Sequence, residues 1–182
     1  MKLKLLMLIL GLQSAWMLGT VFVQEHALHN GTVILLETRP VDPRDLLRGD
    51  YVVLSYRISR IPTNLFSPPL NENLTPGQTV WVALAPRGET HEVVRAATER
   101  FDAGPGEVLV KAKPSWWSPG TNPASVVEVE YGLERYYVGE GTGNPRGKLT
   151  VQAVVPGSGR ASIKQVFMDG KPYAQAMKEL AR

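Results

Sequence analysis

The sequence predicts an all-β domain, an antiparallel sandwich or barrel, preceded by one N-terminal transmembrane helix. Two observations predict this class. Residues 5–23 are uncharged and apolar apart from Gln13, Ser14 and Thr20, and residues 32–168 consist of short apolar or alternating segments separated by turns rich in glycine and proline. Strands at this density, with few helical periods between them, are typical of all-β domains. The predicted divisions are a cytoplasmic N-terminus (1–4), a transmembrane anchor (5–23), a neck (24–31) and an extracytoplasmic β domain (32–182).

The anchor contains 19 consecutive residues, 5–23, without a charged side chain. A helix of that length spans about 28 Å, close to the thickness of the hydrocarbon core of a bilayer. A cleaved signal peptide is the alternative, but the run ends in bulky residues where small residues would form a cleavage site. We therefore favour an uncleaved anchor. Because Lys2 and Lys4 lie at the short N-terminal end, the positive-inside rule places the N-terminus in the cytoplasm and the remaining chain outside it.

One face of the anchor carries small residues. Gly11, Ala15 and Gly19 recur at every fourth position, and Gln13 and Ser14 lie beside them. Small side chains let two helices approach closely, and an amide within the membrane favours a hydrogen-bonding partner over lipid. The same spacing also arises by chance, since glycine and alanine are frequent in membrane helices. We expect these five residues to pack against a helix of a membrane-protein partner, while the rest of the anchor contacts the lipid bilayer.

Charge and cysteine content exclude several classes of function. The net charge is +3, but Lys2 and Lys4 precede the β domain, so the remainder holds 18 basic and 17 acidic side chains. This balance argues against a nucleic-acid-binding protein, which needs a concentrated basic surface. The lack of cysteine excludes disulfide bonds, thiolate metal sites and cysteine nucleophiles. His26 and His29 are spaced for one helix face, but the neck offers no further ligands, so we expect no metal and no cofactor.

The β domain is expected to begin after a turn at Asn30-Gly31. Residues 51–59 give the clearest strand pattern, because apolar and polar side chains alternate with the period of two that marks a half-buried strand. In residues 125–131, Tyr131 shares the apolar face and two glutamates lie on the other. The predicted strands are 32–38, 51–59, 79–85, 92–101, 107–113, 125–131, 149–155 and 161–168, with loops over 61–77 and 114–123 and a helix over 173–180.

The segment 42–51, DPRDLLRGDY, places five charged residues directly before a predicted strand. Its local pattern has a structural explanation. Asp42 is a good helix N-cap, and Pro43 suits the first helical position. Gly49 permits the left-handed conformation that ends a helical turn. These features predict one turn of helix that leads the chain into the strand.

The functional interpretation of this segment concerns its three carboxylates. Asp42, Asp45 and Asp50 could converge as metal ligands or as an acid and a base. However, Arg44 and Arg48 already supply counter-charge, and the segment contains no histidine. We therefore interpret it as a structural or partner-docking corner rather than a catalytic site.

A second cluster gathers acids and aromatic side chains within residues 131–140. Phenol hydroxyls beside carboxylates can hold a ligand or a peptide edge, but alternating tyrosines also pack on a strand without any such role. Trp116 and Trp117 suit a membrane or protein interface, or a cover over one end of the domain. The candidate binding surface comprises Asp42, Arg44, Asp45, Arg48, Asp50, Tyr51, Trp116, Trp117, Tyr131, Glu134, Tyr136, Tyr137 and Glu140.

These two clusters also carry a resemblance to a known family. Gly49-Asp50-Tyr51, followed by Leu54 and Tyr56, matches every fixed letter of the motif after which the GDYxxLxY proteins are named. The preceding stretch RPVDPRD, residues 39–45, is similar as well. The first cluster is thus identified with the family signature.

The second cluster, YGLERYYVGEG over residues 131–141, is similar to the YGIExYFVPEG segment of the same family. It departs from that segment at Leu133, Tyr137 and Gly139, and the last change removes a proline that would stiffen the loop. The closing hairpin through residues 169–172 also matches, so the resemblance covers nearly the whole chain.

The resemblance implies a small bacterial protein anchored in the inner membrane, with its C-terminal domain in the periplasm. The family is of unknown function and is often encoded beside multi-spanning membrane proteins, so no catalytic residue is transferred from it. We expect a non-enzymatic accessory subunit whose β domain docks on a membrane-protein partner. The alternatives are a free-standing periplasmic ligand- or peptide-binding module and a hydrolase of unrecognised type.

Overall fold

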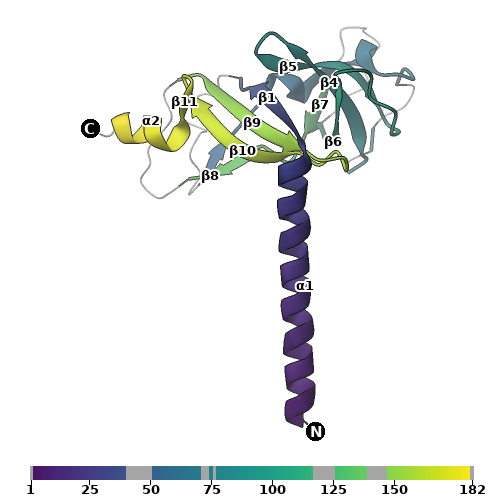
Figure 1. Ribbon diagram of the computed structural model, residues 1–182. Helices are drawn as coiled ribbons and strands as arrows, with labels where there is room; N and C mark the ends of the chain where they lie inside the picture. The colour runs from purple at the N-terminus through teal and green to yellow at the C-terminus, as the bar shows by residue number, and fades with distance from the viewer. Residues whose placement is uncertain are drawn as a thin grey trace.

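The computed structural model describes residues 2–39, 51–70, 74–75, 77–116, 126–138 and 147–180. In this part of the chain, one long helix projects from a β body as a separate rod (Figure 1). The first strand follows the helix directly, so the helix and the body are joined at one end. The two chain termini lie far apart, at the free end of the rod and at one end of the body.

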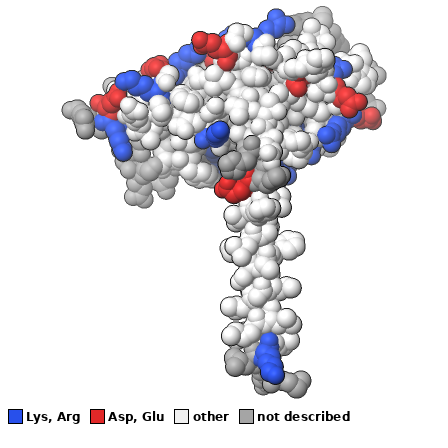
Figure 2. All heavy atoms as spheres, viewed as in Figure 1, with Lys and Arg blue, Asp and Glu red and all other residues white. Residues whose placement is uncertain are grey.

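Helix α1 (Lys2–Asn30) is long and apolar enough, over Lys4–Val23, to span a membrane. None of that window is buried within the chain, and its described side chains are uncharged beyond the basic end (Figure 2). A helix that is apolar on all sides is stable in a protein core or in lipid rather than in water. The helix also continues without a break through residues 24–30. The predicted neck is therefore its last two turns.

The described strands form three antiparallel sheets, and none of these closes into a barrel. The predicted all-β class is confirmed, in the form of open sheets. The four-stranded sheet has the order β1 (Thr32–Glu37), β9 (Leu149–Val155), β10 (Ser162–Met168), β11 (Lys171–Pro172). The five-stranded sheet has the order β3 (Arg60–Pro62), β7 (Val126–Glu130), β6 (Val108–Trp116), β4 (Val80–Arg87), β5 (Thr90–Ala97), and the two-stranded sheet pairs β2 (Tyr51–Val53) with β8 (Arg135–Tyr137).

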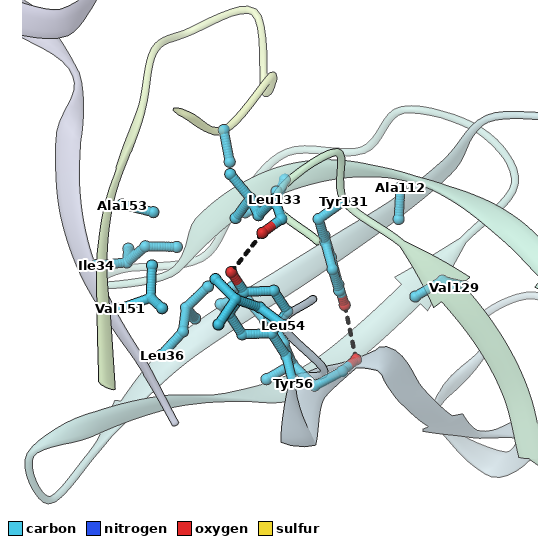
Figure 3. Packing of buried hydrophobic residues seen from close by; sticks show 14 of the residues in the cluster. Ile34, Leu36, Leu54, Tyr56, Ala112, Val129, Tyr131, Leu133, Val151 and Ala153 are labelled. Atoms are coloured by element: carbon cyan, nitrogen blue, oxygen red, sulfur yellow. Dashed lines mark hydrogen bonds between the residues drawn. The ribbon is translucent and has the colours of Figure 1, made fainter. Parts of the chain in front are cut away.

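One hydrophobic core joins all three sheets and the C-terminal helix α2 (Tyr173–Leu180). Strand β1 buries Ile34 and Leu36 and exposes its other face more, as the period of two requires. They lie in the same cluster as Val151 and Ala153 of β9 (Figure 3). Each side chain of valine or leucine size that is fully buried contributes about 1.5–3 kcal/mol. Burial of this kind holds a body that has no cysteine.

The single strand predicted over 51–59 is wrong, although its two faces were assigned correctly. Strand β2 ends at Val53, and the 3-10 helix η1 (Arg57–Ser59) follows before β3. The physical reason is that the segment crosses from one sheet to another, because β2 pairs with β8 and β3 pairs with β7. The residues predicted to face the core are all buried: Val52, Leu54, Tyr56 and Ile58.

Two predicted loops also contain strand. The loop 61–77 begins with residues of β3 and then the 3-10 helix η2 (Thr63–Leu65). In the loop 114–123, β6 continues to Trp116 and pairs with β7 across a register shift between Pro114 and Trp116. A bulge accommodates a proline that cannot donate to the ladder. The remaining predicted strands and the helix over 173–180 are present, with ends that differ by a few residues.

Candidate functional site

The described residues include only part of each candidate cluster. The signature segment is described from Tyr51 onward, and the second segment over residues 131–138. Trp116 has a described backbone at the end of β6, but its side chain is not described. The candidates that lie outside the described residues are Asp42, Arg44, Asp45, Arg48, Asp50, Trp117 and Glu140.

The two motif segments form one structural unit. Strands β2 and β8 pair antiparallel, with Tyr51 opposite Tyr137 and Val53 opposite Arg135. The pairing extends by one hydrogen bond, because the Leu54 backbone N–H donates to the Glu134 carbonyl oxygen at 2.8 Å. Although the segments are far apart in the sequence, each supplies the neighbouring strand of the other. The two motif segments are therefore neighbours in one sheet.

Two buried tyrosines lock this unit into the core (Figure 3). The Tyr56 hydroxyl donates to the Leu133 carbonyl oxygen at 2.7 Å, and the Tyr131 hydroxyl donates to the Ile58 carbonyl oxygen at 2.8 Å. Burial, with a smaller contribution from the Glu134 carboxylate, raises the pKa of both phenols far above the ordinary value. Both hydroxyls therefore stay protonated and act as structural donors. Tyr131 is a core residue and does not belong to the predicted surface.

Glu134 is also occupied locally. Its Oε1 atom accepts a hydrogen bond from the Tyr131 backbone N–H at 2.6 Å. This contact closes a tight turn in which Gly132 has φ +80°, a left-handed conformation that glycine adopts without strain. The carboxylate thus fixes the turn between β7 and β8, and its position is explained without a ligand.

Three residues of this unit form what we call the tyrosine–arginine surface: Tyr51, Arg135 and Tyr137. The rings of Tyr51 and Tyr137 have centroids 6.0 Å apart, and the Arg135 guanidinium lies 5.7 Å from the Tyr51 ring centroid. Tyr137 is 71% exposed. By contrast, Tyr136 turns toward α2, where its ring meets Tyr173 edge-on at 5.6 Å.

The anchor candidates fall into two groups. Ala15 and Gly19 line a groove of about 600 Å³ between α1 and the turn that joins β9 to β10. Gly11, Gln13 and Ser14 are exposed nearer the N-terminus and are not among the residues that line it. A Cβ atom added at Gly11 or Gly19 would meet nothing within 4 Å beyond the neighbouring backbone of the helix itself. Both positions can therefore be approached closely by another molecule.

Sequence reasoning missed the body side of this groove. Its wall consists of residues that were assigned only to a turn and a strand start: Pro156, Ser158, Arg160 and Ser162. A basic residue at the end of the PGSGR turn was the available signal. The pairing of that turn with the anchor depends on how the two are oriented, which the local pattern does not contain.

Metal-binding geometry is not found among the residues that the structure describes, where no three histidine, cysteine or acidic side chains gather for an ion. One histidine has a clear structural contact: His91 Nδ1 accepts a hydrogen bond from the Leu35 backbone N–H at 3.3 Å. This contact links β5 to β1, which are not paired in one sheet. The side chains of His26 and His29 lie outside the described residues.

Comparison with known proteins identifies a family. The model of a protein family described as GDYXXLXY protein matches residues 13–166, from within α1 to β10. The match includes both motif segments and the turn that lines the groove. No curated protein and no solved structure matches the chain.

Proposed function

This chain belongs to the GDYXXLXY protein family, and we propose that it is a non-enzymatic accessory subunit that docks on a membrane-protein partner. In this proposal α1 crosses the bacterial inner membrane with its N-terminus in the cytoplasm, and the β body lies in the periplasm. The partner is a membrane protein that contacts both α1 and the body.

The observation that carries the proposal is the exposure of the apolar window of α1, because no residue of Lys4–Val23 is buried within the chain. Lipid alone would cover such a helix, but lipid does not account for a face of small and polar residues. Gly11 and Ser14 belong to this face and are not among the residues that line the groove, and a Cβ atom added at Gly11 would meet nothing within 4 Å. Small residues of this kind are enriched where two membrane helices pack.

The chemistry of the motif segments supports a binding role over a catalytic one. The described tyrosine and glutamate groups that could carry chemistry, at Tyr56, Tyr131 and Glu134, hold the fold. What the unit offers to a partner is the tyrosine–arginine surface. Aromatic residues and arginine are enriched in protein interfaces, where they provide apolar area together with hydrogen bonds.

The tyrosine–arginine surface also favours the alternative of a free-standing ligand- or peptide-binding module. Two neighbouring rings, tilted at 58° to each other, with a guanidinium beside them suit a short peptide with an acidic group. In that case the body would work without a membrane-protein partner, and α1 would serve only to hold it at the membrane.

Purification from native membranes separates these functions. We expect the full chain, extracted in mild detergent, to carry one membrane protein in stoichiometric amount. Replacing Gly11 and Ser14 by leucine should release that protein while membrane insertion is retained. The matched control adds bulk on the opposite face, with Leu5→Phe and Ile9→Phe, and should keep the partner. An isolated chain in every preparation, or a partner that survives the Gly11→Leu/Ser14→Leu change, contradicts the docking proposal.

A further inference from the structure

The turn that joins β9 to β10, residues 156–161, is held rigidly against the five-stranded sheet. The Gly159 carbonyl oxygen accepts a hydrogen bond from the Lys111 backbone N–H at 2.7 Å, and the Gly157 carbonyl oxygen accepts one from Arg100 Nη2 at 3.3 Å. Gly159 also lies against Trp81, so close that a Cβ atom there would be 2.7 Å from the ring. We call this segment the hairpin turn. Its position beside α1 is fixed by the sheet.

Positive charge collects at the hairpin turn. Arg160 is exposed, and within the described residues it forms no ion pair. Arg100 and Lys111 also lack an acidic partner there, and their cationic groups lie 5.2 Å and 4.9 Å from the centre of the Trp81 ring. Figure 2 shows both acidic and basic side chains where the helix meets the body. The group suited to bind an anion is the guanidinium of Arg160, which forms no ion pair within the described residues.

The groove itself joins an apolar wall to a polar wall. On the helix side it is lined by Ala15, Trp16, Gly19, Thr20 and Val23, which all belong to the span Lys4–Val23. On the body side, Ser158, Ser162 and Arg160 supply two hydroxyls and a guanidinium. If the span lies in hydrocarbon, the hairpin turn lies at the level of the lipid headgroups, because it faces the end of the span. The groove thus crosses the boundary between the two regions of the bilayer.

We infer that this groove binds one anionic phospholipid of the surrounding bilayer. Its phosphate lies at Arg160, within reach of the two serine hydroxyls, and an acyl chain runs along Ala15 and Gly19. A cationic pocket beside a membrane helix is the kind of site that recognises acidic lipid headgroups. The lipid would fill the space between α1 and the body, and it would fix the tilt of the body on the membrane.

A membrane helix of a partner protein is about 10–12 Å wide with its side chains, and its apolar surface offers no anionic group to Arg160, which lines the body side of this groove. A lipid chain is narrower and carries its phosphate at one end, which matches a single cation at the top of the groove. Gly11 and Ser14 do not line the groove, so a lipid bound there leaves these two positions to the partner, although both proposals rest on α1 spanning the membrane.

The test uses the full chain, without any other protein, in vesicles that contain brominated lipid. Trp16 lines the groove and is 78% exposed, so bromine on a bound chain should quench its fluorescence. The signal is isolated by subtracting the quenching of a Trp16→Phe variant. We expect brominated phosphatidylglycerol to bind at this site several-fold more strongly than brominated phosphatidylcholine. The preference should persist in 1 M salt, where general surface attraction is screened.

Two variants connect the preference to the groove. Arg160→Gln should reduce the preference for phosphatidylglycerol about fivefold, the change expected for loss of one cation at a membrane surface. The control Arg87→Gln removes an exposed arginine at the end of β4, in the opposite hairpin, and should leave the preference unchanged. Gly19→Leu fills the apolar wall and should weaken quenching by both lipids at Trp16.

Three results would overturn the inference. Equal quenching by the two lipids in the unchanged protein shows that the groove does not select an anionic headgroup. Full preference in Arg160→Gln shows that the selected lipid lies elsewhere. Loss of the preference on adding inorganic phosphate assigns the site to a free anion. Because the assay contains only this chain and lipid, its outcome does not depend on whether a partner protein co-purifies.

Discussion

The hydroxyl of Tyr56 lies 2.7 Å from the carbonyl oxygen of Leu133, so the last tyrosine of one motif is bonded to the backbone of the other. Both residues are buried, at 0% and 1% exposure. A carbonyl oxygen in that position has no access to water and needs this donor. The family signature therefore lies at a junction in the core. Its two tyrosines have different roles, because Tyr51 is part of the tyrosine–arginine surface and Tyr56 is buried.

We expect Tyr56→Phe to lower the free energy of unfolding by about 1–3 kcal/mol, because it leaves the Leu133 carbonyl oxygen buried without a donor. Tyr131→Phe should have a similar effect through the Ile58 carbonyl oxygen. The control is Tyr137→Phe, since that hydroxyl belongs to a side chain that is 71% exposed. Urea denaturation of the full chain in detergent measures all three. Equal midpoints for Tyr56→Phe and Tyr137→Phe would contradict the assigned role.

Gly159→Ala tests how tightly the hairpin turn is fixed. Gly159 has φ +80°, and its added Cβ would lie 2.7 Å from Trp81. The left-handed conformation alone costs an alanine about 1–2 kcal/mol. Gly88→Ala is the matched control, since Gly88 has φ +64° and a Cβ there meets nothing within 4 Å. Thermal unfolding should show a larger loss for Gly159→Ala, and equal losses would show that the contact with Trp81 is unimportant.

Lowering the pH should reduce the stability of the β body, in part because the Glu37 carboxylate becomes protonated. Its carboxylate binds Lys148 Nζ at 2.7 Å and Arg57 Nη1 at 2.9 Å, and these hydrogen bonds, first from Lys148 and then from Arg57, lower the pKa of Glu37. A carboxyl group whose pKa is lowered by folding adds stability that is complete above its unfolded pKa. That stability is lost as the pH falls through the folded value.

The measurement is the urea midpoint between about pH 5 and pH 3, the range in which such a carboxyl group titrates. We expect the midpoint of Glu37→Gln to fall less steeply with decreasing pH than that of the unchanged chain. Glu89→Gln serves as control, because Glu89 forms no ion pair among the described residues. If both variants follow the unchanged chain, the interactions of Glu37 do not contribute.

The orientation of the anchor can be measured directly because the chain contains no cysteine. We expect a membrane-impermeant maleimide to label Glu89→Cys once the outer membrane is opened. Lys2→Cys should react only after the inner membrane is broken. The intact mass of the labelled protein should include residues 5–23. Labelling in the reverse order, or a mature chain that begins near residue 24, would contradict the proposed topology.

Much of the fold could be predicted from the alternation of apolar and polar side chains, which is a local property of the sequence. The faces of residues 51–59 were correct because side-chain direction alternates whatever sheet the strand joins, whereas the break after Val53 depends on partners from β8 and β7. Tyr131 is an instructive case. Its own strand pattern placed it on the apolar face, and the structure buries it to 4% exposure. Its assignment to a surface together with the neighbouring tyrosines was wrong, because the alternation along its own strand was the better indicator of its position.

The groove could not be predicted in the same way. Arg160 and Gly19 are far apart in the sequence, and neither the turn pattern nor the helix pattern specifies how the body is placed beside α1. Only the assembled chain brings them into one groove. The same limit applies to the partner, since an exposed helix face shows where contact is expected and not which protein makes it.

The most direct test of the docking proposal is site-specific photo-crosslinking in living cells. A photoreactive side chain at Ser14 should yield one discrete adduct with a membrane protein, and the same side chain at Leu5, on the opposite face, should yield none. Adducts with the same protein from Tyr137 would extend the contact to the body. No adduct at Ser14, or equal adducts from both faces of α1, would contradict the account.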